Sequence, residues 1–140
     1  MSAPYSITVS FGDCDPAGIV FYPNIFRWMD AAFHTQLRDF GGHARICRDL
    51  GAIGLGLIDA SAAFQSPLGD GDRVDVMSSI SRWGRKSFTV EHRGQVGDRL
   101  AFTGREIRGV FARTDAGVVS SSVDPLRTLL EPGFQDHGTP

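Results

Sequence analysis

Two carboxylates, Asp13 and Asp15, lie in the segment Phe11-Gly-Asp-Cys-Asp-Pro-Ala-Gly-Ile-Val-Phe-Tyr-Pro-Asn24, between a strand pattern and a long helix pattern. A carboxylate in such a place can attack a carbonyl carbon or activate a water molecule. The first N–H groups of a helix have no acceptor within the helix, so they can stabilise an oxyanion. Asp-Pro steps also favour turns, and the residues alone leave a structural role for both carboxylates open.

Other side chains are weaker candidates for chemistry. Cys14 stands between two acids, which should raise its thiol pKa and weaken it as a nucleophile. Ser87 lacks the glycines of a hydrolase nucleophile elbow. The histidines show no spacing typical of metal ligands: His43, His92 and His137.

Length and composition indicate one ordinary globular domain. The chain has 140 residues, of which 41% are hydrophobic and 21% charged. We expect a domain over residues 1–132 and a disordered tail over residues 133–140. A net charge of −2 argues against nucleic acid as a partner. The lack of a long apolar run, of a secretory signal and of a disulfide framework predicts a cytoplasmic protein with no membrane partner.

The hydrophobic pattern predicts one long helix and several strands. Pro23 suits a first helical position, and the apolar stripe Phe26, Met29, Phe33, Leu37 and Phe40 runs to Gly41-Gly42. Alternating residues predict strands over 5–11, 57–65, 73–83, 86–96, 100–112 and 118–123, with helical turns near 44–50 and 126–130. Strands in succession predict an antiparallel sheet in an α+β fold. One helix covers one face of that sheet, so we expect the other to associate with another subunit.

Several segments resemble the 4-hydroxybenzoyl-CoA thioesterases of the hotdog-fold superfamily. The resemblance rests on the segment 11–24, followed by Arg27-Trp-Met-Asp-Ala-Ala32, Trp83-Gly-Arg-Lys-Ser-Phe88 and Glu106-Ile-Arg108. It implies a hotdog fold, an antiparallel sheet wrapped around one long helix. It also implies a homo-oligomer, a dimer of dimers with sites at subunit interfaces.

The resemblance assigns the catalytic carboxylate to Asp15. Its role as nucleophile or as general base stays open. The backbone N–H of Tyr22 is implied to polarise the thioester carbonyl, in agreement with the argument from the helix start. Gly18 and Phe21, in the same segment, are implied to bind substrate.

Asp30 has two interpretations. It interrupts the apolar stripe of the helix, and it can pair with His34 four residues later. The resemblance instead implies that it recognises the para-hydroxyl group of the substrate ring, since a buried acceptor discriminates strongly against analogues that lack the hydroxyl.

The segment Arg85-Lys86-Ser87 reads as a solvated turn on its own, but the resemblance implies that it binds the phosphates of coenzyme A. Two departures weaken this grip. Gly84 replaces a second arginine, and the late turn 116–119 is not basic, so phosphate binding could fall to Arg108 and Arg113.

The sequence thus predicts hydrolysis of an aromatic acyl-CoA thioester, with 4-hydroxybenzoyl-CoA as the expected substrate and no metal or redox cofactor. The alternatives are a thioesterase for another acyl-CoA, such as benzoyl, phenylacetyl or short aliphatic, and a non-catalytic acyl-CoA binding module. A structural protein with incidental aspartates would bind no CoA thioester at all.

Overall fold

The structure is a computed structural model that describes residues 4–131, so the expected tail over 133–140 lies outside the described residues. The strands are β1 (Tyr5–Thr8), β2 (Gly54–Phe64), β3 (Arg73–Trp83), β4 (Phe88–Val96), β5 (Arg99–Thr114) and β6 (Gly117–Ser121). The helices are α1 (Pro23–Leu37), α2 (His43–Leu50) and α3 (Asp124–Leu130), with 3-10 turns η1 (Phe11–Asp13) and η2 (Arg38–Phe40).

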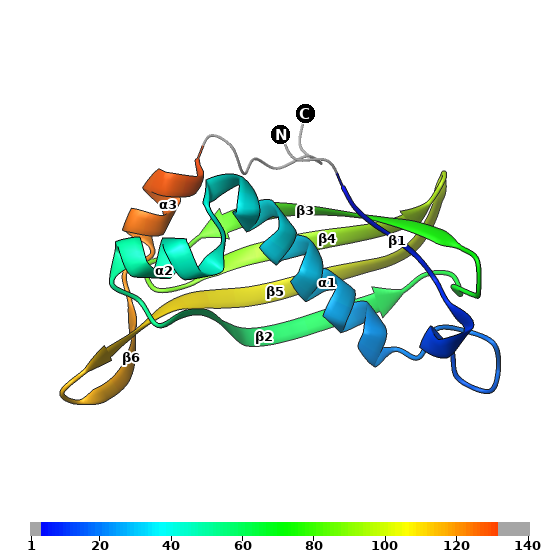
Figure 1. The fold of residues 1–140 in the computed structure, drawn as a ribbon, viewed down its shortest axis with the longest axis horizontal. Coiled ribbons are helices and arrows are strands. Elements are labelled where there is room, and N and C mark those ends of the chain that lie inside the picture. Colours follow the sequence, from blue (N-terminus) through cyan, green and yellow to red (C-terminus); the bar gives the residue numbers. More distant parts are fainter. Residues whose placement is uncertain (1–3, 132–140) are drawn as a thin grey trace.

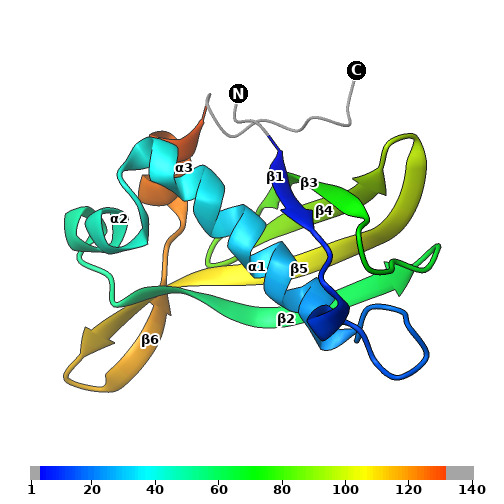
Figure 2. The ribbon, with the colours of Figure 1, turned by 45° about the vertical axis from the view of Figure 1, so that its right-hand side comes forward.

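All strands join one antiparallel sheet that curves around α1 (Figure 1). Its order is β1-β3-β4-β5-β2, and β6 pairs with the end of β5. Figure 2 shows α1 crossing the hollow face of this sheet, while α2 and α3 lie together near the β6 end. This is the α+β hotdog arrangement that the sequence predicted.

Helix α1 begins and ends where its sequence indicates. Pro23 occupies the first turn, and Gly41 takes a φ of 102° after the 3-10 turn that extends the helix. The stripe that it buries against the sheet consists of Ile25, Trp28, Met29, Ala32, Phe33, Gln36 and Leu37. The buried stripe is broader than the predicted one, and the predicted Phe40 lies in η2 rather than in the helix.

The first strand is shorter than its alternating pattern predicted. β1 pairs with β3 only from Tyr5 to Thr8, and Phe11 is 69% exposed although the pattern placed it on the buried face. The reason is local, since the chain turns at Ser10, whose N–H donates to Oδ2 of Asp13 at 2.9 Å. The buried face of this segment therefore ends at Val9.

Strand β2 forms one edge of the sheet. It pairs with β5 along its inner side, and the register shifts between Leu57 and Asp59, so that Ile58 bulges out. Leu57 and Ile58 are both about half exposed, at 51% and 53%. The edge is long and largely uncharged, and no other element of the described chain covers its outer side. Such an exposed edge can pair with a strand of another chain.

The turn between β3 and β4 departs from prediction in its boundary. The strand that was expected to begin at Lys86 begins at Phe88. Arg85, Lys86 and Ser87 instead form a tight turn, in which the Gly84 N–H donates to the Ser87 carbonyl at 2.8 Å.

Candidate active site

The segment before α1 is fastened to the helix start by backbone groups. The carbonyl of Asp13 accepts hydrogen bonds from the Phe21 N–H and from Nδ2 of Asn24, both at 2.9 Å. The Val20 N–H donates to the carbonyl of Leu68 at 2.8 Å. These contacts fix the loop between η1 and α1 against the first turn of α1 and against the segment that follows β2.

Asp15 lies within this loop and is half-buried. Its Oδ1 accepts the Ala17 N–H at 2.9 Å, as an aspartate does in an Asx turn. Its backbone carbonyl accepts the Gly18 N–H at 2.9 Å, and Gly18 has the positive φ of 83° that favours glycine. Within residues 4–131, Oδ2 of Asp15 has no hydrogen-bond partner. One oxygen thus holds the turn while the other is available for chemistry.

Asp15 lines a cavity of about 390 Å³ together with Tyr22 of the helix start. The remaining wall is mostly apolar and includes Ile19, Val20, Ile25, Phe64 and Leu68. The backbone N–H of Tyr22 donates to no acceptor in the described part of the chain, as expected for the residue that precedes a helix. Asp15, with its free carboxylate oxygen, and Tyr22, with its unpaired helix-start amide, therefore line the same largely apolar cavity.

The two neighbours of Asp15 have structural roles or poor reactivity. Asp13 caps the η1 turn through Ser10, so its side chain is used in folding. Burial, with the negative charges of Asp70, Asp13 and Asp15, raises the pKa of the Cys14 thiol. Its Sγ lies 3.7 Å from the carbonyl of Ser10, to which it can donate. Both features disfavour Cys14 as the nucleophile.

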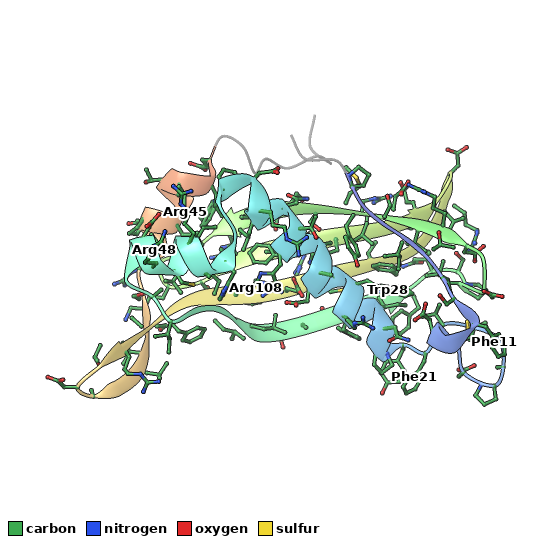
Figure 3. The ribbon with its side chains drawn as sticks, in the orientation of Figure 1. Phe11, Phe21, Trp28, Arg45, Arg48 and Arg108 are labelled. Atoms are coloured by element: carbon green, nitrogen blue, oxygen red, sulfur yellow. The ribbon has the colours of Figure 1, made fainter. Side chains whose placement is uncertain are left out.

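Phe21 and Gly18 lie beside the cavity but are not part of its lining. Phe21 is 51% exposed, and its ring meets that of Tyr22 edge to face at 5.5 Å. The Tyr22 ring in turn lies 6.4 Å from that of Phe64. Figure 3 shows Phe21 at the start of α1, near the loop that carries Phe11. The rings of Tyr22 and Phe64 thus lie near each other in residues that both line the cavity.

Asp30 lies farther along α1 and does not line this cavity. It comes eight positions after Tyr22, which along a helix is a rise of about 12 Å. Its Oδ1 accepts a hydrogen bond from Nη2 of Arg108 at 2.8 Å and lies 3.5 Å from Nε2 of His34. Hydrogen bonds from His34 and Arg108 hold the pKa of the Asp30 carboxyl well below its usual range. The pairing with His34 that the helical spacing suggested is present.

Arg85, Lys86 and Ser87 lie near the opposite end of the sheet from Asp15. Phe88, which follows them, pairs with Arg108 of β5, and Arg108 pairs with Leu57 of β2. The side chains of Arg85 and Lys86 are exposed and make no ion pair within residues 4–131. One copy of the chain therefore does not bring this turn to Asp15.

The alternative role of Arg108 in phosphate binding is wrong. Arg108 is 2% exposed, and its guanidinium is occupied by Glu106 and Asp30. A buried and paired arginine cannot reach a phosphate group in solvent. Arg113, at the exposed end of β5, remains accessible.

A buried polar cluster escaped the prediction. His92 follows Phe88 and Val90 at steps of two on the buried face of β4, and Glu106 and Arg108 share a face of β5. That alternation could have shown that His92 is a core residue facing the two charges.

Within residues 4–131, no group of three or more His, Cys, Asp or Glu side chains could hold a metal ion. No helix in that part of the chain is long and apolar enough to cross a membrane.

Comparison with known proteins identifies the family of this chain. The sequence model of the thioesterase superfamily matches residues 17–105, well over half of the chain. The chain belongs to the thioesterase superfamily and is by class an acyl-CoA thioesterase with a hotdog fold.

The relatives act on different aromatic substrates. The chain is 34% identical over 116 residues to the 4-hydroxybenzoyl-CoA thioesterase of Pseudomonas sp. (strain CBS-3), which covers 76% of this chain and 80% of the relative. It is 32% identical over 130 residues to the 1,4-dihydroxy-2-naphthoyl-CoA hydrolase of Synechococcus sp. (strain WH7803), with coverages of 88% and 84%. A solved gentisyl-coenzyme A thioesterase superposes with a TM-score of 0.71 at 34% identity, covering 89% of this chain and 96% of that one.

Proposed function

We propose that the protein hydrolyses the CoA thioester of a hydroxylated aromatic acid, with 4-hydroxybenzoyl-CoA as the best candidate. The observation that carries this proposal is the cavity that Asp15 and Tyr22 both line, since Asp15 has a free carboxylate oxygen and Tyr22 has an unpaired helix-start amide. The relatives named for 4-hydroxybenzoyl-CoA and 1,4-dihydroxy-2-naphthoyl-CoA support a hydroxylated aromatic acyl group.

The proposed chemistry uses these two groups on one carbonyl. Oδ2 of Asp15 either attacks the thioester carbon or takes a proton from a water molecule that attacks it. In the first route the tetrahedral adduct expels the CoA thiolate and leaves a mixed anhydride of Asp15 with the acyl group, which water then cleaves to the free acid. In either route the Tyr22 N–H donates to the carbonyl oxygen as it gains negative charge, a contribution worth roughly 10²–10³ in rate for such donors.

The cavity wall fits an aromatic acyl group. Its apolar side chains, together with Phe64 and Tyr22, provide contact for a planar ring and keep bulk water from the thioester. Phe21 and Gly18 are proposed to contact the substrate at the entrance, where the thioester linkage meets the loop. The coenzyme is part of the substrate, and the scheme needs no metal or redox cofactor.

A dimer through the β2 edge would complete the site. β2 spans Gly54–Phe64, so its midpoint is Asp59. Antiparallel pairing of β2 with a second copy about that midpoint places position 55 opposite position 63, and position 57 opposite position 61. Asp30 and the Arg85–Ser87 turn lie near the Leu55 and Leu57 end through Arg108. The second copy would thus carry both toward the cavity beside Phe64.

This assembly assigns the remaining roles. Asp30 of the second copy would accept the ring hydroxyl, and its Arg85, Lys86 and Ser87 would bind the CoA phosphates at the rim. We also propose that two such dimers form a tetramer, as the family resemblance suggests.

A hydrolysis screen with a thiol reagent tests the function. CoA release is measured from 4-hydroxybenzoyl-, 1,4-dihydroxy-2-naphthoyl-, gentisyl-, benzoyl-, phenylacetyl- and acetyl-CoA, and kcat/KM is compared. We expect the hydroxylated aromatic thioesters to be preferred. A preference for benzoyl-, phenylacetyl- or acetyl-CoA would reject this substrate class, and binding without any CoA release would indicate a binding module.

A further inference from the structure

The largest buried polar cluster in the described chain lies under α1 and apart from the Asp15 cavity. It contains five side chains that are at most 5% exposed: Gln36, Ser78, His92, Glu106 and Arg108. Oγ of Ser78 lies 2.7 Å from Nδ1 of His92, and Nε2 of His92 lies 2.7 Å from Oε1 of Glu106. The side chains of Ser78, His92 and Glu106 thus form a continuous chain of hydrogen bonds across β3, β4 and β5, and Nε2 of Gln36 on α1 donates to the Ser78 carbonyl at 3.1 Å.

The direction of these hydrogen bonds follows from the groups involved. A carboxylate can only accept, so Nε2 of His92 carries the proton that is donated to Glu106. In a neutral imidazole Nδ1 is then an acceptor, and the Ser78 hydroxyl donates to it. His92 is thereby fixed in one tautomer and holds Glu106 in one orientation.

Glu106 in turn holds Arg108. Nε of Arg108 donates to Oε1 of Glu106 at 3.2 Å, and Nη2 donates to Oε2 at 3.1 Å. The guanidinium also lies over the ring of Phe33, 4.4 Å from its centroid. Such a fork grips both the orientation and the position of the arginine in a way that a lysine could not.

The cluster reaches the surface at Asp30. Nη2 of Arg108 also donates to Oδ1 of Asp30 at 2.8 Å, and the Asp30 side chain is 53% exposed. His34 approaches the same oxygen, at 3.5 Å. Oδ2 of Asp30 has no hydrogen-bond partner within residues 4–131. Figure 3 shows Arg108 lying alongside α1 at a distance from Phe21.

Stability alone is a weak explanation for this cluster. A buried ion pair often contributes little to stability compared with apolar residues of similar volume, because both charges lose their hydration. In this cluster two buried charges, Glu106 and Arg108, and a buried histidine, His92, hold a single half-exposed carboxylate. A role in positioning that carboxylate explains why the series of hydrogen bonds ends at Asp30.

We propose that Arg108 is a positioning residue for Asp30: Ser78, His92 and Glu106 fix the guanidinium, which fixes the Asp30 carboxylate as an acceptor for a phenolic hydroxyl of the substrate. The inference rests on the proposed function, since Asp30 must meet the acyl group. It adds that selectivity for the hydroxyl depends on residues that never touch the substrate. The ionised state favoured by His34 and Arg108 suits this role, because Asp30 can then accept a hydrogen bond but not donate one.

The test is the ratio of kcat/KM for 4-hydroxybenzoyl-CoA to kcat/KM for benzoyl-CoA. A general loss of folded enzyme cancels in this ratio, so a purely structural role would not move it. We expect Asp30→Asn and Arg108→Gln each to lower the ratio by about tenfold or more, because the first removes the negative charge of the acceptor and the second removes the group that orients it. The double variant should match Asp30→Asn alone, because both changes remove one interaction.

Arg105→Gln is the matched control. Arg105 lies on the same strand and pairs with Glu91 at 3.1 Å on the surface, so its loss should leave the ratio unchanged. If Arg108→Gln does not fold, Arg108→Lys decides the matter. It keeps the buried positive charge but cannot serve Glu106 and Asp30 together, so the ratio should still fall.

The outcomes separate the two levels of the argument. An unchanged ratio in a folded Arg108 variant, alongside a lowered ratio in Asp30→Asn, would overturn the positioning role and leave the proposed function intact. An unchanged ratio in Asp30→Asn would overturn the inference as well. A wild-type protein that releases no CoA from either thioester would reject the proposed function itself.

Discussion

Oδ1 of Asp15 accepts the backbone N–H of Ala17 at 2.9 Å, so the carboxylate is oriented by the turn that contains it. The length of the side chain matters for this contact. Asp15→Glu keeps the negative charge but adds a methylene group, which moves the carboxylate out of the Asx turn and away from the carbonyl. We expect a fall in kcat of roughly 10²–10³ for such a displacement. A lowered kcat in steady-state kinetics, with unchanged thermal stability of the variant, would support this prediction. Near-normal turnover would contradict it.

Cys14 tests whether the neighbouring thiol takes part. Burial and the nearby charges of Asp70, Asp13 and Asp15 raise the thiol pKa, so the thiolate is scarce near neutral pH. Cys14→Ala should retain turnover, and the wild-type thiol should react with iodoacetamide more slowly than a free cysteine at pH 7.5. A strong loss of kcat in Cys14→Ala would instead make the thiol part of the chemistry.

His43 should give the fold a dependence on pH. Its Nε2 accepts the Leu55 N–H at 3.1 Å, and burial, with the charges of His34 and Arg108, lowers its pKa from the usual 6.5. The unfolded chain binds the proton more readily, so this stabilisation is present above about pH 6.5 and is lost as pH falls toward the folded pKa. Urea unfolding at pH 7.5 and 5.5 should show a larger loss of stability in the wild type than in His43→Gln. Equal losses would show that His43 does not carry the effect.

The β2 edge tests the proposed assembly. Ile58 bulges from the edge and is 53% exposed in the single chain. Ile58→Lys places a charge where the second copy would pair, a change that blocks edge pairing. We expect sedimentation to show a smaller species and CoA release to fall with it, because Asp30 and the Arg85–Ser87 turn would no longer reach the cavity.

Leu129→Lys is the control for this change. Leu129 is an exposed apolar residue, at 39%, on α3 and away from β2. It should leave both the assembly and the activity unaltered. An Ile58→Lys protein that keeps the wild-type mass and turnover would exclude the β2 edge as the interface.

Local signals predicted the elements that position the site. Pro23 and Gly41 bracket α1 because each suits a backbone geometry that few other residues favour, and both effects act within one turn. The alternating strands and the succession of strands gave the antiparallel sheet in the same way. The prediction that Phe11 is buried was wrong because alternation does not reveal where a strand stops pairing. The hydrogen bond from the Ser10 N–H to Asp13 ends the first strand early.

The site was harder to predict wherever it depends on distant contacts. The loop with Asp15 and Tyr22 is continuous in sequence, so its pattern and family resemblance located both. The pairing of Asp30 with His34 followed from helical spacing, but its second partner, Arg108, is 78 residues away, and no local pattern shows that the two meet. The turn with Arg85 and Lys86 lies near the other end of the sheet from Asp15 in one chain, and only the proposed second copy would bring the two together.

The most direct measurement compares Asp15→Asn with Asp13→Asn. Asparagine at position 15 can still accept the Ala17 N–H, so the turn should persist while the negative charge is lost. Asparagine at position 13 can likewise still accept the Ser10 N–H. The account predicts that kcat for 4-hydroxybenzoyl-CoA falls by roughly 10²–10⁴ in Asp15→Asn, with substrate still bound, and stays near the wild-type value in Asp13→Asn. Full turnover in Asp15→Asn would contradict it.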